Sequence, residues 1–122
     1  MNIATVNVRG LNDPNKRQTF LHWLKKQNID VTCLQETFIT KDYISRLQTD
    51  WDGEVIICLS VSPHSCGCAV LFKKDFEFEI KDYTLDKEGR RLLINICHSG
   101  QIITIVCLYA PNSDTQTFHS GL

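Results

Sequence analysis

Residues 3–37, IATVNVRGLNDPNKRQTFLHWLKKQNIDVTCLQET, decide the fold of this chain. The β-rich run Ile3–Val8 predicts a strand. Asp13 and Pro14 then supply an N-cap and a first helical residue, and the apolar stripe that follows them predicts a helix. A second strand is expected at Val31–Gln35. Strand, helix and strand over this length form a βαβ unit, whose strands lie parallel and are joined by a right-handed crossover.

This unit brings polar side chains to one edge of the sheet. The carboxyl ends of parallel strands share an edge, and open α/β sheets bind ligands there. Asn7 and Glu36 lie at or beside these ends, so we expect them to be neighbours although they are distant in sequence. A glutamate that ends an apolar strand has two interpretations, a residue of the solvated rim or a carboxylate that binds a cation.

The rest of the chain is mostly strand. A short surface helix is expected at residues 41–49, and Ser99-Gly100 predicts a tight hairpin turn. The βαβ unit therefore opens a mixed, largely antiparallel sheet, and the fold class is α+β. The strands expected after the helix are Val55–Leu59, Cys68–Phe72, Phe76–Tyr83, Arg91–Cys97 and Ile102–Leu108.

Length and composition set limits on the class of protein. A chain of 122 residues with 43% hydrophobic and 22% charged residues is expected to form one domain with its own core. The net charge of -1 gives no hint of a nucleic-acid partner and does not exclude one. No apolar stretch approaches the roughly 20 residues that span a bilayer. The N-terminus lacks the features of a signal peptide, so we expect an intracellular protein, nuclear or cytoplasmic, that is not secreted and does not enter a membrane.

The six cysteines predict free thiols rather than a disulfide framework or a zinc site. Four of them lie in apolar runs, as small buried residues do. Cys66 and Cys68, with Cys58 and His64 nearby, suggest zinc binding, but their one-residue spacing differs from the C-x₂₋₄-C of structural zinc sites. Structural thiols are the favoured interpretation.

Three polar blocks stand at predicted strand ends: NVRGLN at 7–12, LQET at 34–37 and YAPN at 109–112. Each block alone is typical of a turn or a solvated strand end. Together, in this order, and with GCAVLFKK at 67–74 and GRRLLINI at 89–96, they resemble the exonuclease-endonuclease-phosphatase superfamily. The chain is most similar to the N-terminal half of the apurinic-type endonuclease domain of non-LTR, LINE-like retrotransposons.

The resemblance implies a magnesium-dependent hydrolysis of DNA phosphodiesters, with Mn²⁺ as a possible substitute for Mg²⁺. Glu36 matches the glutamate that binds the cation, and Asn7 matches the asparagine that supports the metal site and the phosphate. Tyr109 and Asn112 match polar groups that contact the scissile phosphate. One glutamate at a cleft is a reasonable magnesium anchor, because this cation keeps several waters and takes one or two carboxylates.

The first block departs from the pattern of cellular apurinic endonucleases. Arg9 stands where those enzymes tend to carry an aspartate, which fits the retrotransposon branch and puts a repair role in doubt. We assign substrate binding to Arg9 and Asn12, with DNA as the substrate.

The GDxN and SDH-type blocks of the family are not found in residues 1–122. We therefore expect a partial domain, about half of the four-layer α/β sandwich. Such a half is expected to hold one sheet, to leave the face that meets the partner sheet exposed, and to self-associate through that face.

Several alternatives remain open. The chain could be a nicking endonuclease, a non-catalytic truncated remnant that at most binds nucleic acid, or a hydrolase of phosphoinositides or another small phosphoester. A redox or zinc module built on Cys66 and Cys68 is the fourth. The basic pairs Arg90-Arg91 and Lys73-Lys74 suggest a phosphate-facing patch, although such pairs are more often solvated strand ends.

Overall fold

The opening segment of the chain folds as its sequence predicts. The structure is a computed structural model that describes residues 1–109. It is α+β and opens with a βαβ unit, which confirms the predicted fold class. The elements are β1 (Ile3–Asn7), α1 (Pro14–Lys25), β2 (Val31–Gln35), the 3₁₀ turn η1 (Lys41–Tyr43), α2 (Ile44–Asp50), β3 (Val55–Cys58), β4 (Cys68–Phe72), β5 (Glu79–Leu85), β6 (Arg91–His98) and β7 (Gln101–Leu108).

The βαβ unit is set by local chemistry. Strands β1 and β2 are parallel, and Asn7 lies opposite Gln35 at the carboxyl end of the ladder. The side chain of Asp13 caps α1 by accepting a hydrogen bond from the backbone N–H of Asn15 at 3.3 Å, and Pro14 is the first helical residue. Both positions agree with the sequence prediction.

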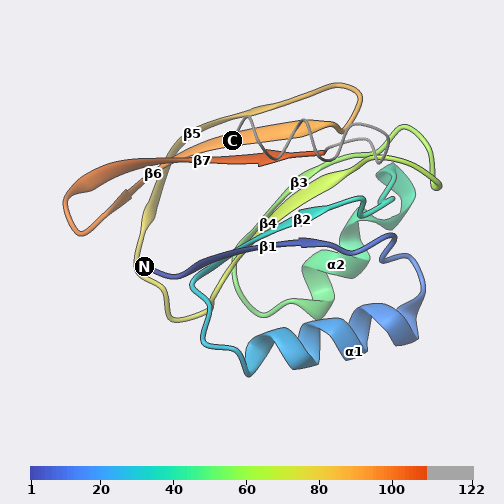
Figure 1. Ribbon diagram of the computed structural model, residues 1–122, viewed down its shortest axis with the longest axis horizontal. Helices are drawn as coiled ribbons and strands as arrows, with labels where there is room; N and C mark the ends of the chain where they lie inside the picture. Colours follow the sequence, from blue (N-terminus) through green and yellow to red (C-terminus); the bar gives the residue numbers. More distant parts are fainter. Residues whose placement is uncertain (110–122) are drawn as a thin grey trace, which may run out of the picture.

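The strands form two sheets rather than one, so the single-sheet prediction was wrong. The first sheet has the order β1-β2-β4-β3, and the second has the order β5-β6-β7. Figure 1 shows the second sheet stacked on the face of the first that is opposite α1 and α2. The reason is visible in β4, whose five residues are all buried. A strand that is apolar on both faces needs a layer on each side, and β5–β7 supply the second layer.

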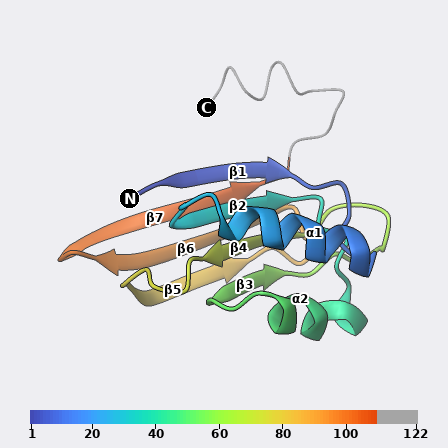
Figure 2. The ribbon, with the colours of Figure 1, turned by 90° about the horizontal axis from the view of Figure 1, so that it is seen from below.

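Two apolar cores follow from this layering. One lies between the first sheet and the helices, which cover that face in Figure 2, and includes Leu21, Leu34 and Leu47. The other lies between the sheets and includes Phe72 and Ile94. Among the described residues no helix is both long and apolar enough to cross a bilayer.

The core between the sheets contains free thiols. Cys33 and Cys107 are buried and unpaired by any disulfide. Their mutual hydrogen bond, followed by burial, raises the pKa of Cys33 far above its ordinary value. The same bond lowers the pKa of Cys107, but a hydrogen bond with Cys68 and burial outweigh it and raise that pKa to about 12. Both side chains therefore stay as neutral thiols, as the sequence predicted for small buried residues.

The hairpin between β6 and β7 also agrees with the sequence. Ser99 and Gly100 both have positive φ, +51° and +77°, and His98 pairs with Gln101 across the turn. The strand predicted at Phe76–Tyr83 begins three residues later, at Glu79. Phe76 and Phe78 still pack against the core between the sheets, which explains their alternating pattern.

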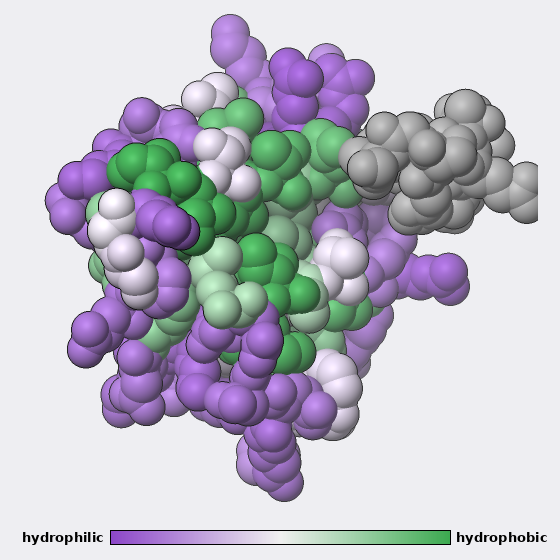
Figure 3. Space-filling view, turned by 60° about the vertical axis from the view of Figure 1, so that its left-hand side comes forward, coloured by the Kyte–Doolittle hydropathy of each residue, from purple (hydrophilic) through white to green (hydrophobic). Residues whose placement is uncertain are grey.

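The three-stranded sheet has no helix on its outer face within residues 1–109. Leu93 and Val106 lie opposite each other in the β6–β7 ladder on that face, and Val106 is 50% exposed. Ile102, at the hairpin, and Ile3, in the edge strand β1, are also exposed. Figure 3 shows apolar surface gathered on the side that carries the N-terminus and the hairpin. The prediction that the face meeting the partner sheet is exposed was wrong, because β5–β7 cover it; the exposed apolar residues lie on the outer face of the second sheet, at the hairpin and on β1.

Candidate active site

The carboxyl ends of β1 and β2 bring Asn7 and Glu36 together, as the βαβ unit predicts. Asn7 is the last residue of β1 and Glu36 follows the last residue of β2. The side-chain amide of Asn7 donates a hydrogen bond to Oε2 of Glu36. Both side chains are at the solvent-accessible end of the sheet. The pair therefore presents one fixed carboxylate to solvent at the edge where ligands of such sheets bind.

Glu36 lies in a strained but well-supported backbone conformation. Its φ is +55°, in the left-handed region that non-glycine residues rarely adopt. Its carbonyl accepts a hydrogen bond from Gly10 N–H at 2.6 Å, and that of Thr37 accepts one from Leu11 N–H at 2.9 Å. On the other side, Thr37 N–H donates to the carbonyl of Gly67 at 3.1 Å. Two neighbouring loops thus hold the carboxylate-bearing turn from both sides.

Gly67 makes this arrangement possible. Its φ is +88°, and a Cβ atom there would lie 2.5 Å from Oγ1 of Thr37. Its N–H also donates to the carbonyl of Gly89 at 2.7 Å. The turn after β2 and the two loops before β4 and β6 therefore meet at one point, and a side chain at position 67 would separate them.

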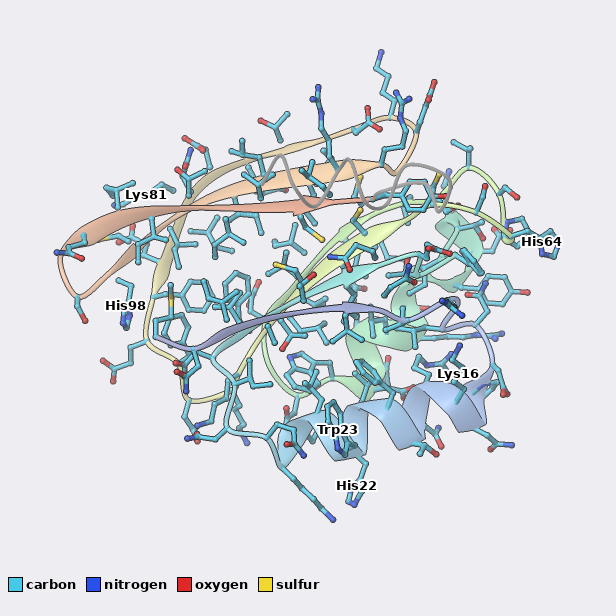
Figure 4. The ribbon with its side chains drawn as sticks, viewed as in Figure 1. Lys16, His22, Trp23, His64, Lys81 and His98 are labelled. Atoms are coloured by element: carbon cyan, nitrogen blue, oxygen red, sulfur yellow. The ribbon has the colours of Figure 1, made fainter. Side chains whose placement is uncertain are left out.

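Arg9 lies on the exposed loop that follows β1. Its backbone N–H donates to Oδ1 of Asn7 at 3.2 Å, and its carbonyl accepts from Nζ of Lys16 at 3.0 Å. Figure 4 shows Lys16 at the first turn of α1, next to this loop, whereas His22 and Trp23 lie at the other end of the helix. The lysine fixes the loop and adds positive charge beside Arg9. Sequence reasoning missed Lys16, whose only signal was its place in the first turn of the helix.

Asn12 is turned away from solvent. Its side-chain amide donates to the backbone carbonyl of Phe38 at 2.8 Å, while its backbone carbonyl accepts a hydrogen bond from the guanidinium of Arg17 at 3.3 Å. It therefore connects the loop after β1 to the loop after β2. Its predicted contact with substrate stays a prediction.

Tyr109 follows β7, and it lies at the Glu36 end of the sheets because Cys107, two residues earlier, accepts a hydrogen bond from Nε2 of Gln35 at 3.6 Å. Its backbone N–H donates to the carbonyl of Arg90 at 2.7 Å. Partial removal of the phenol from water raises the pKa of Tyr109 above its ordinary value, and electrostatic interactions with Glu36 and Cys66 raise it further. At neutral pH the hydroxyl is therefore protonated and able to donate a hydrogen bond. Asn112, the fourth residue that the sequence predicts here, lies outside the described residues.

The sequence suggested Cys66 as a structural thiol or as part of a redox or zinc module, and the structure places it beside the candidate site. It lies close enough to Tyr109 to influence its ionisation, and its carbonyl accepts a hydrogen bond from Phe38 N–H at 3.0 Å. In the described part of the chain no group of three or more His, Cys, Asp or Glu residues can hold a metal ion. Cys58 and Cys68 are buried beneath the second sheet, and Figure 4 places His64 at the rim. The zinc alternative has no site among these residues.

The two basic pairs lie at opposite ends of the sheets. Lys73 follows the end of β4 that pairs with the beginning of β2, away from Glu36, and its Nζ donates to Oδ1 of Asn28 at 2.7 Å. Arg90 is at the Glu36 end, next to Tyr109, and forms ion pairs with Asp86 and Glu88 at 3.4 Å and 3.0 Å. A single phosphate-facing patch made of both pairs is therefore excluded.

The donor set fits a hard cation that keeps most of its water. Glu36 would supply one carboxylate to such a cation, and the hydrogen bond from Asn7 orients that carboxylate. Magnesium takes one or two carboxylates and fills its other positions with water and phosphate oxygens, so Glu36 would hold it loosely. The same residues do not form the closed cage that a structural metal site requires.

Comparison with known proteins identifies the family. The sequence profile of the endonuclease/exonuclease/phosphatase family matches residues 4–119. This chain belongs to that family. Its members are typically magnesium-dependent. An exodeoxyribonuclease of Bacillus subtilis (strain 168) is 28% identical over 118 residues, which make up 93% of this chain and 44% of the relative.

Solved structures show the same fold. The catalytic domain of Xenopus laevis APE2 superposes with a TM-score of 0.67 and 20% identity, over 95% of this chain and 47% of that one. The AP endonuclease LMAP from Leishmania major gives a TM-score of 0.66 and 19% identity, over 98% of this chain and 42% of that one. This chain thus spans about half the length of the relatives it matches, in agreement with the predicted half of the fold.

Proposed function

We propose that this chain is the metal-binding half of a magnesium-dependent DNA endonuclease of the kind found in non-LTR retrotransposons. The observation that carries the proposal is the contact between Asn7 and Glu36 at the carboxyl ends of β1 and β2, with Tyr109 at the same end of the sheets. The names of the relatives, an exodeoxyribonuclease and an AP endonuclease, support DNA as the substrate. Arg9 supports the retrotransposon branch.

Each described residue of the site has a role that its position supports, and Asn112 keeps the role that the family resemblance implies. A bound Mg²⁺ would polarise a phosphoryl oxygen and stabilise the leaving oxygen. Glu36 supplies the carboxylate that holds the cation, and Asn7 fixes the orientation of that carboxylate. Tyr109, which is protonated at neutral pH, donates a hydrogen bond to a phosphate oxygen. Arg9 attracts the DNA backbone from the exposed loop, and Asn112 contributes a second phosphate contact.

The test is nicking of supercoiled plasmid by the purified chain in Mg²⁺. Glu36→Ala and EDTA are both expected to abolish the nicking. Glu77→Ala is the matched control, because Glu77 is an exposed glutamate whose carbonyl contacts His98 near the hairpin, at the opposite end of the sheets from Glu36. Nicking that survives Glu36→Ala would refute the assignment of the cation site.

A folded chain that binds Mn²⁺ through Glu36 but does not nick DNA would have the cation site without catalysis. That result would favour the remnant over the active endonuclease. Cleavage of a small phosphoester with no effect on plasmid would replace DNA as the substrate class.

A further inference from the structure

The side chain of Asn12 completes the framework that holds Glu36. The β1–β2 ladder continues past its last regular pair through hydrogen bonds from Gly10 N–H to the Glu36 carbonyl and from Leu11 N–H to the Thr37 carbonyl, at 2.6 Å and 2.9 Å. The next connection along the same line is the Asn12 side-chain amide, which donates to the Phe38 carbonyl at 2.8 Å. A side chain thus takes the place of a backbone N–H in the ladder.

Asn12 is itself held by the helical layer. The guanidinium of Arg17, on α1, donates to the backbone carbonyls of Leu11 at 3.0 Å and Asn12 at 3.3 Å. Arg17 is buried and forms an ion pair with Asp50, the last residue of α2, at 2.6 Å. A chain of contacts therefore runs from both helices through Asn12 to the turn that carries Glu36.

The oxygen of the Asn12 side-chain amide carries an energetic cost, in contrast to the nitrogen, which donates to the Phe38 carbonyl. Within residues 1–109, Oδ1 of Asn12 is buried and has no hydrogen-bond partner. A buried polar atom without a partner reduces stability, which offsets part of what the hydrogen bond from Asn12 to the Phe38 carbonyl contributes. The contribution of Asn12 that an apolar residue would lack is its hydrogen bond to the Phe38 carbonyl.

We propose that Asn12 is a positioning residue that sets the orientation of Glu36 toward a divalent cation, rather than a residue that contacts substrate. The inference rests on the proposed function, because it requires Glu36 to bind the cation. Residues that orient a metal ligand typically change metal affinity by 10- to 100-fold when they are replaced. Because Asn12 acts through the backbone of the turn rather than directly on the carboxylate, we expect the lower end of this range.

The experiment measures the affinity of the purified chain for Mn²⁺ by electron paramagnetic resonance, with no DNA present. Asn12→Leu keeps the branching of the side chain and its number of heavy atoms and removes the donor, and Asn12→Ala removes the donor and the branched side chain. Both variants are expected to bind Mn²⁺ about tenfold more weakly than the native chain. Asn15→Ala, an exposed asparagine three positions along the chain, is the matched control and is expected to bind normally.

Circular dichroism under the same conditions gives the folded fraction, and the dissociation constant is calculated for that fraction alone. A merely structural role would lower the folded fraction and leave this constant unchanged, which would overturn the inference. Glu36→Ala separates the two proposals. If it binds Mn²⁺ like the native chain, the proposed function fails; if it loses binding while both Asn12 variants keep it, only the role of Asn12 is refuted.

Discussion

Arg17 is the residue whose replacement tests the packing of the site most directly. Its side chain is 5% exposed and that of Asp50 is 20% exposed, with 2.6 Å between Nε and Oδ2. The guanidinium also donates to two carbonyls of the loop after β1. Its neighbours are thus three oxygen atoms of which two belong to the backbone and cannot be removed by substitution.

These contacts predict unequal costs for the two partners. Removing one member of a buried ion pair costs roughly 3–5 kcal/mol, and we expect about 4 kcal/mol for Arg17→Ala because the two carbonyls also lose a charged donor. Asp50→Ala is expected to cost about 2 kcal/mol, since Asp50 is partly exposed and the guanidinium keeps its carbonyl acceptors. The double variant is expected to cost less than the sum, with a coupling energy of about 2 kcal/mol.

Urea unfolding followed by tryptophan fluorescence measures these free energies. Trp51 is a suitable reporter because it is 6% exposed and its indole N–H donates to the Phe72 carbonyl at 2.9 Å. Arg46→Ala, which removes an exposed arginine that stacks on Tyr43, is the matched control and is expected to cost no more than about 1 kcal/mol. A cost for Arg17→Ala no larger than that of the control would refute the buried-pair reasoning.

Three further predictions test other parts of the structure. The folded state raises the pKa of Cys33 and Cys107 above the ordinary value of 9.0, so the folded chain binds these protons more tightly. Stability should therefore fall by about 1.4 kcal/mol per thiol between pH 8 and pH 10; a melting temperature that is constant over this range would contradict this. Gly67→Ala places a Cβ atom 2.5 Å from Oγ1 of Thr37, at a residue with positive φ. The variant should lose roughly 2–3 kcal/mol of stability in urea unfolding; an unchanged stability would show that the loops adjust freely. The exposed apolar surface should make the purified chain self-associate in analytical ultracentrifugation, and Ile102→Lys should shift it toward monomer; a monomeric native chain that binds no apolar dye would refute this.

Local chemistry explains which parts of the fold could be predicted from the sequence. The strands at Val31–Gln35 and Cys68–Phe72 have the bounds that their apolar runs predict. The helix begins where Asp13 and Pro14 place it, and Ser99-Gly100 forms the predicted hairpin. Each of these signals acts over a few residues, so no knowledge of the tertiary structure is needed to interpret it.

The second sheet could not be predicted in the same way. Alternation in β6 shows that one face is buried, but it does not show which layer covers that face. The apolar residues on both faces of β4 require a layer on each side, but the sequence does not show which strands supply the second layer. The burial of Arg17 could not be predicted either, because a basic residue in the first turns of a helix is normally solvated. The ion pair with Asp50, on α2, explains why Arg17 is buried here.

The candidate site also has features that the sequence predicts and features that it does not. Parallel strands predict that Asn7 and Glu36 meet, and they do. The positive φ of Glu36 has no sequence signal, because glycine is the residue that normally adopts such a conformation. A solvated glutamate at a strand end would adopt an ordinary backbone conformation without any loss of stability. Here the loops that contain Gly10 and Gly67 hold the turn from both sides against that preference, and strain that the surrounding structure maintains is characteristic of functional sites. This maintained conformation adds to the contact with Asn7 at the edge of the sheet, and the two together support the interpretation of Glu36 as a ligand for a cation rather than as a residue of the rim.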